Sequence, residues 1–239
     1  VKRVSLELGG KGANIIFSDC DVEKAVKRGA AHCFNNTGQS CNAPTRMLVQ
    51  KDVYQKAIQI AQETAENTEV NEPNLSGNHI GPLVSEVQYN KVQDLIDAGI
   101  KEGAKLIAGG LGRPDGFNRG YFVRPTVFAD VNNDMRIARE EVFGPVLSII
   151  PFETEEEAIA ISNDTSYGLT DYVQSGDSER TQRVARQLRA GMVQVNGAPR
   201  ASGSPFGGYK QSGNGREGGI EGFEEFLETK AVSGWTTTS

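Results

Sequence analysis

The sequence is poor in cysteine: its 239 residues include only three, at positions 20, 33 and 41. Three cysteines are too few for a disulfide framework, and an odd number leaves at least one thiol free. No apolar run approaches the roughly 20 residues that cross a bilayer, and no basic segment followed by an apolar one opens the chain. These absences predict no membrane partner and a reducing compartment, the cytosol or an organelle matrix. Our expectation is a cytoplasmic protein.

Basic residues are also fewer than acidic ones. The 25 Lys and Arg residues are outnumbered by 31 Asp and Glu, which gives a net charge of −6. Nucleic acids require a basic surface, so we expect no nucleic-acid partner. With 37% hydrophobic and 23% charged residues, the composition is that of an ordinary globular protein, long enough for one or two domains. The chain starts at Val1 and not at Met, so we expect it to be the middle of a longer protein.

Short apolar runs alternate with helical patterns along the chain, which predicts an α/β fold with a mostly parallel sheet flanked by helices. Asp19 or Asp21, Thr154 and Ser178 are the candidate helix caps. We predict strands at 13–17, 46–50, 105–108, 121–131, 146–152, 171–174 and 192–195, and helices at 22–33, 53–61, 84–103, 153–163 and 178–189. The tail has a weak helical pattern at 220–228 and a β-prone end at 231–238.

Cys41 ends a polar loop, Asn36-Thr-Gly-Gln-Ser-Cys41, in which Gly38 allows a backbone turn. Main-chain N–H groups around such a turn favour a thiolate, whereas a free thiol titrates near ~8.5. A thiolate outside apolar packing is a competent nucleophile. Composition alone leaves a packing role for Cys41 equally open. Cys20 and Cys33 lie in or beside an apolar helix, so we interpret both as packing residues.

The sequence gives this cysteine no obvious histidine partner. His32 falls in a helical pattern and His79 in a polar loop, and nothing links either to Cys41, so a Cys-His protease dyad is unsupported. No Cys and His set has zinc-ligand spacing, and we predict no metal. A Gly-x-Gly-x-x-Gly string at 213–218 follows no clear strand, so we do not interpret it as a pyrophosphate site.

Four segments together resemble the NAD(P)-dependent aldehyde dehydrogenase superfamily, in this order and at similar spacing: Glu7-Leu-Gly-Gly-Lys11, the Cys41 loop, Glu140-Glu-Val-Phe-Gly-Pro-Val146, and 205–217. The resemblance covers essentially the whole chain. It implies an aldehyde dehydrogenase catalytic domain at 1–214 and a C-terminal tail with an oligomerisation strand at 215–239. The upstream NAD(P)-binding domain and the asparagine that helps to hold the oxyanion would then lie largely outside these residues.

The resemblance also implies roles for two reactive residues. Cys41 matches the nucleophile that attacks the aldehyde, giving a thiohemiacetal and then a thioester. Glu7 matches the residue that activates water to hydrolyse the thioester, which a carboxylate can do when it is ionised and within reach. Without the motif, Glu7 would be interpreted as a solvated carboxylate at a strand end.

The cofactor in this resemblance is NAD or NADP. Glu141 matches the ligand of the nicotinamide ribose hydroxyls, and Phe143 matches the aromatic contact beside it. Leu8 and Gly9 match the backbone that approaches the nicotinamide carboxamide. Phe206 and the small-residue loop 197–204 match the rim of the substrate tunnel, although Phe206 fits a core position equally well.

The predicted function is therefore oxidation of a small-molecule aldehyde to a carboxylic acid with NAD(P)⁺, by a homo-oligomer, a dimer or a tetramer. Relatives that pass the acyl group to coenzyme A or phosphate lack a base at the Glu7 position, so Glu7 favours hydrolysis. Two alternatives stay open. The chain alone is an inactive folding and oligomerisation module, or it acts only as a thiol-dependent esterase.

Overall fold

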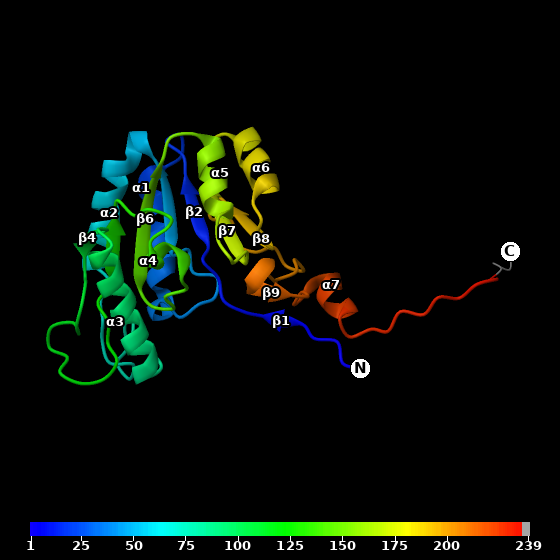
Figure 1. Cartoon of the computed structure of the whole chain (residues 1–239), viewed down its shortest axis with the longest axis horizontal. Coiled ribbons are helices and arrows are strands. Elements are labelled where there is room, and N and C mark those ends of the chain that lie inside the picture. Colours follow the sequence, from blue (N-terminus) through cyan, green and yellow to red (C-terminus); the bar gives the residue numbers. More distant parts are fainter. Residues whose placement is uncertain (236–239) are drawn as a thin grey trace.

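A seven-stranded sheet forms the centre of the computed structural model, which describes residues 1–235 (Figure 1). Every neighbouring pair of strands is parallel except the first two in spatial order, which are antiparallel. The predicted α/β class with a mostly parallel sheet is confirmed. In spatial order the strands are β4 (Lys105–Ala108), β5 (Thr126–Ala129), β6 (Val146–Phe152), β3 (Arg46–Gln50), β2 (Ala13–Ile16), β7 (Thr170–Gln174) and β8 (Met192–Val195).

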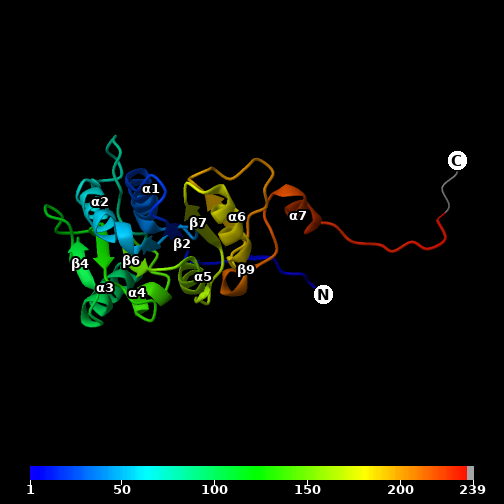
Figure 2. The ribbon, with the colours of Figure 1, turned by 90° about the horizontal axis from the view of Figure 1, so that it is seen from above.

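Helices cover both faces of this sheet, and each face has its own apolar core. On one face, α1 (Val22–Phe34) and α2 (Tyr54–Glu66) pack against one set of strand residues. The other set packs against the helices α3 (Glu86–Lys101), α4 (Arg136–Arg139), α5 (Glu155–Asn163) and α6 (Ser178–Gln187). Figure 2 shows α1 and α2 on the side of the sheet opposite to α3 and α4. Central strands buried on both faces explain the continuous apolar runs of the sequence.

Side-chain caps determine where several helices begin. Asp21, not Asp19, caps α1 by accepting the Lys24 backbone N–H, and Thr154 caps α5 as predicted. The expectation that Ser178 is the cap of α6 is wrong. The cap is Asp177, whose carboxylate accepts two backbone N–H groups of the first turn, at 2.8 and 3.3 Å. Both N–H groups donate to the same oxygen, Oδ1, and its negative charge also complements the positive end of the helix dipole.

Other boundaries also differ from the prediction. The strand expected at 121–131 forms only at 126–129, because Pro125 has no N–H to give to a sheet ladder. The tail helix, α7 (Gly219–Glu224), ends earlier than the predicted 228. A short antiparallel ribbon of β1 (Leu6–Glu7) and β9 (Gly213–Asn214) was not foreseen. Residues 231–235 form no strand in this single chain, and 236–239 lie outside the described residues.

The N-terminal segment and α7 lie on one side of the sheet. Figure 1 shows the N-terminal segment and α7 extending from the β7–β8 end of the sheet, away from α2 and α3. Among residues 1–235, no helix has both the length and the apolarity needed to cross a membrane.

Candidate active site

Three of the four motifs meet at the edge of the sheet where the parallel strands begin. They immediately precede β2, β3 and β6, so the parallel arrangement brings them to the same edge. Gly10 lies directly against the backbone carbonyl of Cys41, and a Cβ on Gly10 would overlap that oxygen. The Gly10 N–H donates to Glu141 Oε1 at 2.9 Å. Gly38 likewise lies against the carbonyl of Gly144, with no room for a Cβ. The Glu7, Cys41 and Glu141 segments are therefore one packed unit.

The turn that leads to Cys41 is conformationally strained. After α1 ends, a single 3₁₀ turn, η1 (Asn35–Gly38), contains Asn36 at φ 51° and Thr37 at φ 58°, and Gly38 follows at φ 70°. Left-handed backbone is unfavourable for a β-branched residue such as threonine. The Thr37 hydroxyl donates to the Gly81 carbonyl at 3.0 Å, which helps to hold the turn. The turn leaves Cys41 half-buried near the end of the loop.

The charges around Cys41 oppose ionisation of its thiol. Burial and the nearby Glu7 carboxylate raise the pKa of Cys41, and Glu141 adds to this effect. The backbone N–H groups of Cys41 and Asn42 lower it, as the loop predicts, but they do not offset the first two causes. The donors expected from the sequence are present and favour the thiolate, but burial and Glu7 outweigh them, and the role of Cys41 as the nucleophile stays a prediction.

The other two cysteines are packing residues, as predicted. Cys33 is fully buried, its sulfur lies 3.5 Å from the Val146 carbonyl oxygen, and burial raises its pKa to about 12. Cys20 is half-buried, and burial together with neighbouring aspartates raises its pKa to about 11. Neither histidine contributes to the pKa of Cys41, so a protease dyad gains no support.

Glu7 is placed by the β1–β9 ribbon, in which it pairs with Gly213. A Cβ built on Gly207 would lie 3.0 Å from Glu7 Oε1, so the 205–217 motif lies beside this carboxylate, although Glu7 as a whole is exposed. Burial and the Glu217 carboxylate raise the pKa of Glu7, while the Arg216 guanidinium opposes them. Glu217 ends the 205–217 motif, but the sequence reasoning gave it no role.

Glu141 is held at one oxygen and free at the other. Its Oε1 accepts the Gly10 N–H, while Oε2 lies beside the Cα of Gly9 and accepts no hydrogen bond from residues 1–235. Phe143, two residues later, is half-buried with φ 52°. The Gln88 side chain fixes this strained turn by donating to the Val142 and Phe143 carbonyls, both at 2.9 Å. The same short segment therefore carries a carboxylate oxygen without a partner among the described residues and an aromatic side chain two residues later.

Phe206 and Leu8 are the remaining predicted site residues. Phe206 is half-buried, and its backbone exchanges two hydrogen bonds with Glu217, both at 2.7 Å. The Arg200 guanidinium stands 5.7 Å from the centre of the Phe206 ring. Leu8 is 45% exposed, and its N–H donates to the Ser212 carbonyl at 3.1 Å.

The family profile of aldehyde dehydrogenases matches residues 1–232. The chain belongs to the aldehyde dehydrogenase family. It is 58% identical over 235 residues to the 3-succinoylsemialdehyde-pyridine dehydrogenase of a Pseudomonas species, covering 98% of this chain and 49% of that protein.

Solved aldehyde dehydrogenases have the same fold. The enzyme from Bartonella henselae gives a TM-score of 0.96 at 61% identity, over 98% of this chain and 49% of that one. A cysteine-to-alanine variant of aldehyde dehydrogenase C from Pseudomonas syringae was solved with NAD⁺ and octanal. It gives a TM-score of 0.96 at 49% identity, over 100% of this chain and 49% of that one. The chain thus spans about half the length of these relatives.

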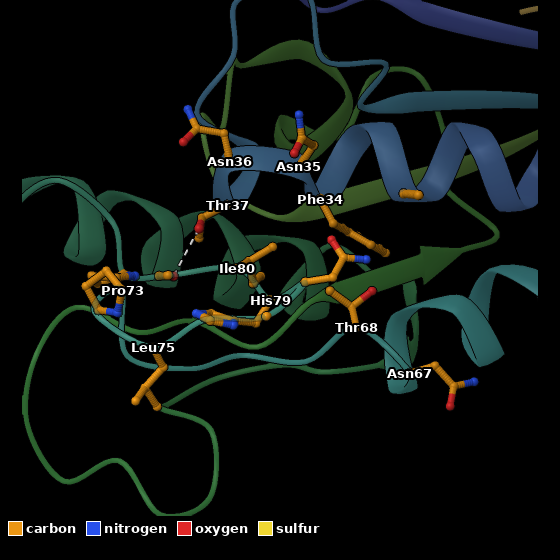
Figure 3. A pocket seen from close by; sticks show the side chains of 15 residues that line it. Phe34, Asn35, Asn36, Thr37, Asn67, Thr68, Pro73, Leu75, His79 and Ile80 are labelled. Carbon is orange, nitrogen blue, oxygen red and sulfur yellow. Dashed lines mark hydrogen bonds between the residues drawn. The ribbon is translucent and has the colours of Figure 1, made fainter.

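Two other features of this aldehyde dehydrogenase chain adjoin the packed unit. The Gly-x-Gly-x-x-Gly string supplies β9 and is followed by a helix of only six residues. A hollow of about 660 Å³ between η1 and the 73–82 loop is lined mainly by amides, His79 and apolar side chains (Figure 3), and neither Cys41 nor Glu7 lines it. No group of three or more potential metal ligands occurs in the part of the chain that the structure describes.

Proposed function

We propose that this chain carries the catalytic residues of an NAD(P)-dependent aldehyde dehydrogenase that oxidises an aldehyde to a carboxylic acid. The observation that supports this most is the packing of the Glu7, Cys41 and Glu141 segments at one sheet edge, with Glu7 close enough to raise the pKa of Cys41. A nucleophile, a base and a free carboxylate oxygen beside an aromatic ring are the groups that the reaction requires.

The domain organisation belongs to the same proposal. Residues 1–214 are the catalytic domain, and 215–239 are a tail that carries an oligomerisation strand. Most of the NAD(P)-binding domain is supplied by polypeptide outside these 239 residues. Support comes from the relatives, of which this chain covers about half.

In the proposed reaction the Cys41 sulfur, once its proton is lost, attacks the aldehyde carbon. A C–S bond forms and the carbonyl oxygen becomes an oxyanion beside the backbone N–H of Cys41. Bound NAD(P)⁺ supplies the hydride acceptor, and loss of hydride from the thiohemiacetal leaves a thioester on Cys41. Water then adds to the thioester carbon, and the C–S bond breaks to release the acid and restore the thiol.

Glu7 is the proposed base for the hydrolytic step. It takes a proton from the attacking water at a carboxylate oxygen and returns it as the sulfur leaves. A raised pKa makes the carboxylate a stronger base while it stays ionised near neutral pH. Arg216 keeps that rise small, since its positive charge acts against burial and Glu217.

The residues for the nicotinamide end of the cofactor fit a dinucleotide. The free Glu141 Oε2 can accept hydrogen bonds from ribose hydroxyls. Phe143 contributes an aromatic face next to it, and Leu8 and Gly9 contribute exposed backbone. Phe206 borders the proposed aldehyde entrance, since the following residue, Gly207, contacts Glu7.

The test is substitution in the complete polypeptide that contains this chain. Cys41→Ala is expected to abolish aldehyde oxidation, because no other group can form the thioester. Glu7→Gln is expected to let the thioester accumulate, detectable by mass spectrometry of the trapped protein, because water is no longer activated. Cys20→Ala is the matched control and is expected to retain activity. Normal steady-state turnover by either the Cys41 or the Glu7 variant would refute the assignment.

A second candidate is a cofactor-free esterase, favoured by the presence of both Cys41 and Glu7 within this chain. It predicts slow hydrolysis of a p-nitrophenyl ester that is lost when Cys41 is alkylated. A third, the silent folding and oligomerisation module, predicts no NAD⁺ binding by these 239 residues. Micromolar NAD⁺ binding in a calorimetric titration would contradict it.

The assembly and location are also proposals. The exposed apolar side chains of the tail, 59% exposure at Phe223 and 88% at Phe226, favour a homo-oligomer, a dimer or a tetramer. The free cysteines and acidic composition favour a cytoplasmic enzyme with no nucleic-acid or membrane partner.

A further inference from the structure

Tyr172 reaches the cysteine loop from the neighbouring strand. It lies on β7, is 4% exposed, and its hydroxyl donates to the backbone carbonyl of Asn42 at 2.7 Å. Asn42 directly follows Cys41. A buried hydroxyl needs a hydrogen-bond acceptor, and this one finds it next to the proposed nucleophile, 130 residues away in the sequence.

An aromatic contact holds one side of the Tyr172 ring. His32, from α1, packs against the ring in a T-shaped arrangement, with centroids 5.4 Å apart and an interplanar angle of 83°. Burial lowers the pKa of His32, which favours the neutral imidazole in this contact. A cavity of about 180 Å³ also adjoins the ring and is bordered by Pro44, after the cysteine loop. The phenol is therefore held by the His32 contact and by its hydrogen bond to the Asn42 carbonyl.

Asn42 connects Tyr172 to the sulfur. Its N–H is one of the two backbone groups that lower the pKa of Cys41. Its side chain is also held, because Ser40 Oγ donates to Asn42 Oδ1 at 2.8 Å. Fixing the carbonyl and the side chain of one residue restricts its φ and ψ, and with them the direction of its N–H beside Cys41.

We propose that Tyr172 is a positioning residue that keeps the Asn42 N–H on the Cys41 sulfur and so supports the thiolate against the Glu7 and Glu141 carboxylates. The inference rests on the proposed function only in taking Cys41 as the reacting group. Tyr172 acts as a neutral donor, since burial and the neighbouring charges of Asp171 and Cys41 raise its pKa. It touches neither the aldehyde nor the cofactor in this scheme.

The test is the pH dependence of Cys41 alkylation by iodoacetamide, followed by mass spectrometry of the Cys41 peptide. Tyr172→Phe keeps the ring and removes the hydroxyl. Its rate constant near pH ~8 is expected to be roughly fivefold lower than in the wild-type chain, the loss expected for one hydrogen bond. The midpoint of the profile moves to higher pH, and the plateau at high pH stays unchanged because the thiolate itself is unaltered.

Tyr54→Phe is the matched control. Tyr54 is 6% exposed and receives the Asp130 N–H at 2.7 Å, with no hydrogen bond to the cysteine loop. Its variant loses a comparable buried hydroxyl and is expected to keep the wild-type midpoint. An unchanged midpoint in folded Tyr172→Phe, or an equal shift in Tyr54→Phe, would overturn the proposal. Where Tyr172→Phe fails to fold, His32→Leu replaces it, with a smaller shift in the same direction expected and an unchanged midpoint again contradicting the proposal.

Alkylation of Cys41 requires no aldehyde oxidation. The experiment therefore tests the Tyr172 inference independently of the proposed function. A complete polypeptide that shows the alkylation shift but oxidises no aldehyde would leave the Tyr172 inference standing and remove the proposed function. In an active enzyme, Tyr172→Phe is expected to lower kcat roughly fivefold with KM unchanged. A change in KM alone would contradict a role in positioning the sulfur.

Discussion

Lys11 is a buried cation with no hydrogen-bond partner. Its side chain is 1% exposed, and its Nζ contacts no acceptor among residues 1–235. Burial lowers the pKa of Lys11 to about 7, and the neighbouring Arg46 acts in the same direction. The sequence places Lys11 at the end of the Glu7 motif, but no local pattern indicates that the amine is enclosed.

This amine predicts a pH-dependent stability. In the unfolded chain Lys11 titrates near ~10.4, so between about pH 7 and about pH 10 the unfolded state binds more protons than the folded state. The free energy of unfolding therefore rises with pH across that window. Lys11→Met keeps the side-chain volume and removes the charge. This variant is expected to raise the free energy of unfolding by roughly 1–4 kcal/mol near pH ~7. Urea denaturation measures both effects.

The control for this prediction is Lys27→Met. Lys27 is exposed and pairs with Glu23 at 2.6 Å, so its loss is expected to change the free energy of unfolding very little, because solvent screens an exposed ion pair. If the free energy of unfolding of Lys11→Met rose with pH as in the wild-type chain, the titration of Lys11 would not be the cause of that rise.

At the level of single elements, α5 begins with a reciprocal cap. Thr154 Oγ1 accepts the Glu157 N–H at 3.2 Å, and Glu157 Oε2 accepts the Glu153 N–H at 2.6 Å. Thr154→Ala is expected to lower the free energy of unfolding by about 1 kcal/mol, because it leaves a helix N–H unpaired. Thermal unfolding is the measurement. Glu156→Ala, on the exposed side of the same turn, is expected to have little effect, and equal losses in the two variants would argue against capping.

The β1–β9 ribbon makes a second element-scale prediction, on catalysis. Gly213 has φ 113°, and a Cβ there would overlap the Leu6 carbonyl. Gly213→Ala is therefore expected to displace Glu7 and slow thioester hydrolysis roughly tenfold, with a smaller effect on thioester formation. Rapid-quench kinetics of the complete enzyme separates the two steps. Gly116→Ala is the control, since Gly116 also has a positive φ, 86°, but open space around it and no place in the proposed site. A matching defect in that variant would indicate general backbone strain.

The β1–β9 ribbon could not be predicted from the sequence, whereas several longer strands could. The strands at 46–50 and 192–195 were predicted with their observed bounds, because an apolar run between turn residues is a local signal. Two residues such as Leu6–Glu7 carry no such signal, and their partners lie more than 200 positions away. The cap of α6 was missed by one residue because Asp177 and Ser178 are both good caps.

The same distinction applies to the site. Cys41 and Glu7 were singled out from their motifs, and the structure brings their segments together. The direction of the Cys41 pKa was not predictable, because it depends on a carboxylate that arrives from another element. Tyr172 had no motif at all, and only the pairing of β7 with β2 brings it near the loop.

At the scale of the whole molecule, the tail leaves apolar side chains in solvent. Exposure is 63% at Ile220, 88% at Phe226 and 80% at Trp235. Phe226→Asp is expected to shift the complete protein to smaller species in sedimentation velocity, because a charge would then be buried between subunits. Leu111→Asp, at a 48% exposed position in a loop beyond β4, serves as the control. An unchanged sedimentation profile for Phe226→Asp would exclude this face from the interface.

The position of the motifs at the starts of the parallel strands has an electrostatic consequence. In such a fold each helix runs opposite to its strands, so the starts of the strands lie beside helix C-termini, and α1 ends seven residues before Cys41. The peptide dipoles of a helix sum to about half a negative charge at that end. The fold itself therefore disfavours an anionic sulfur here, and negative charge that develops during the reaction depends on individually aimed amide groups.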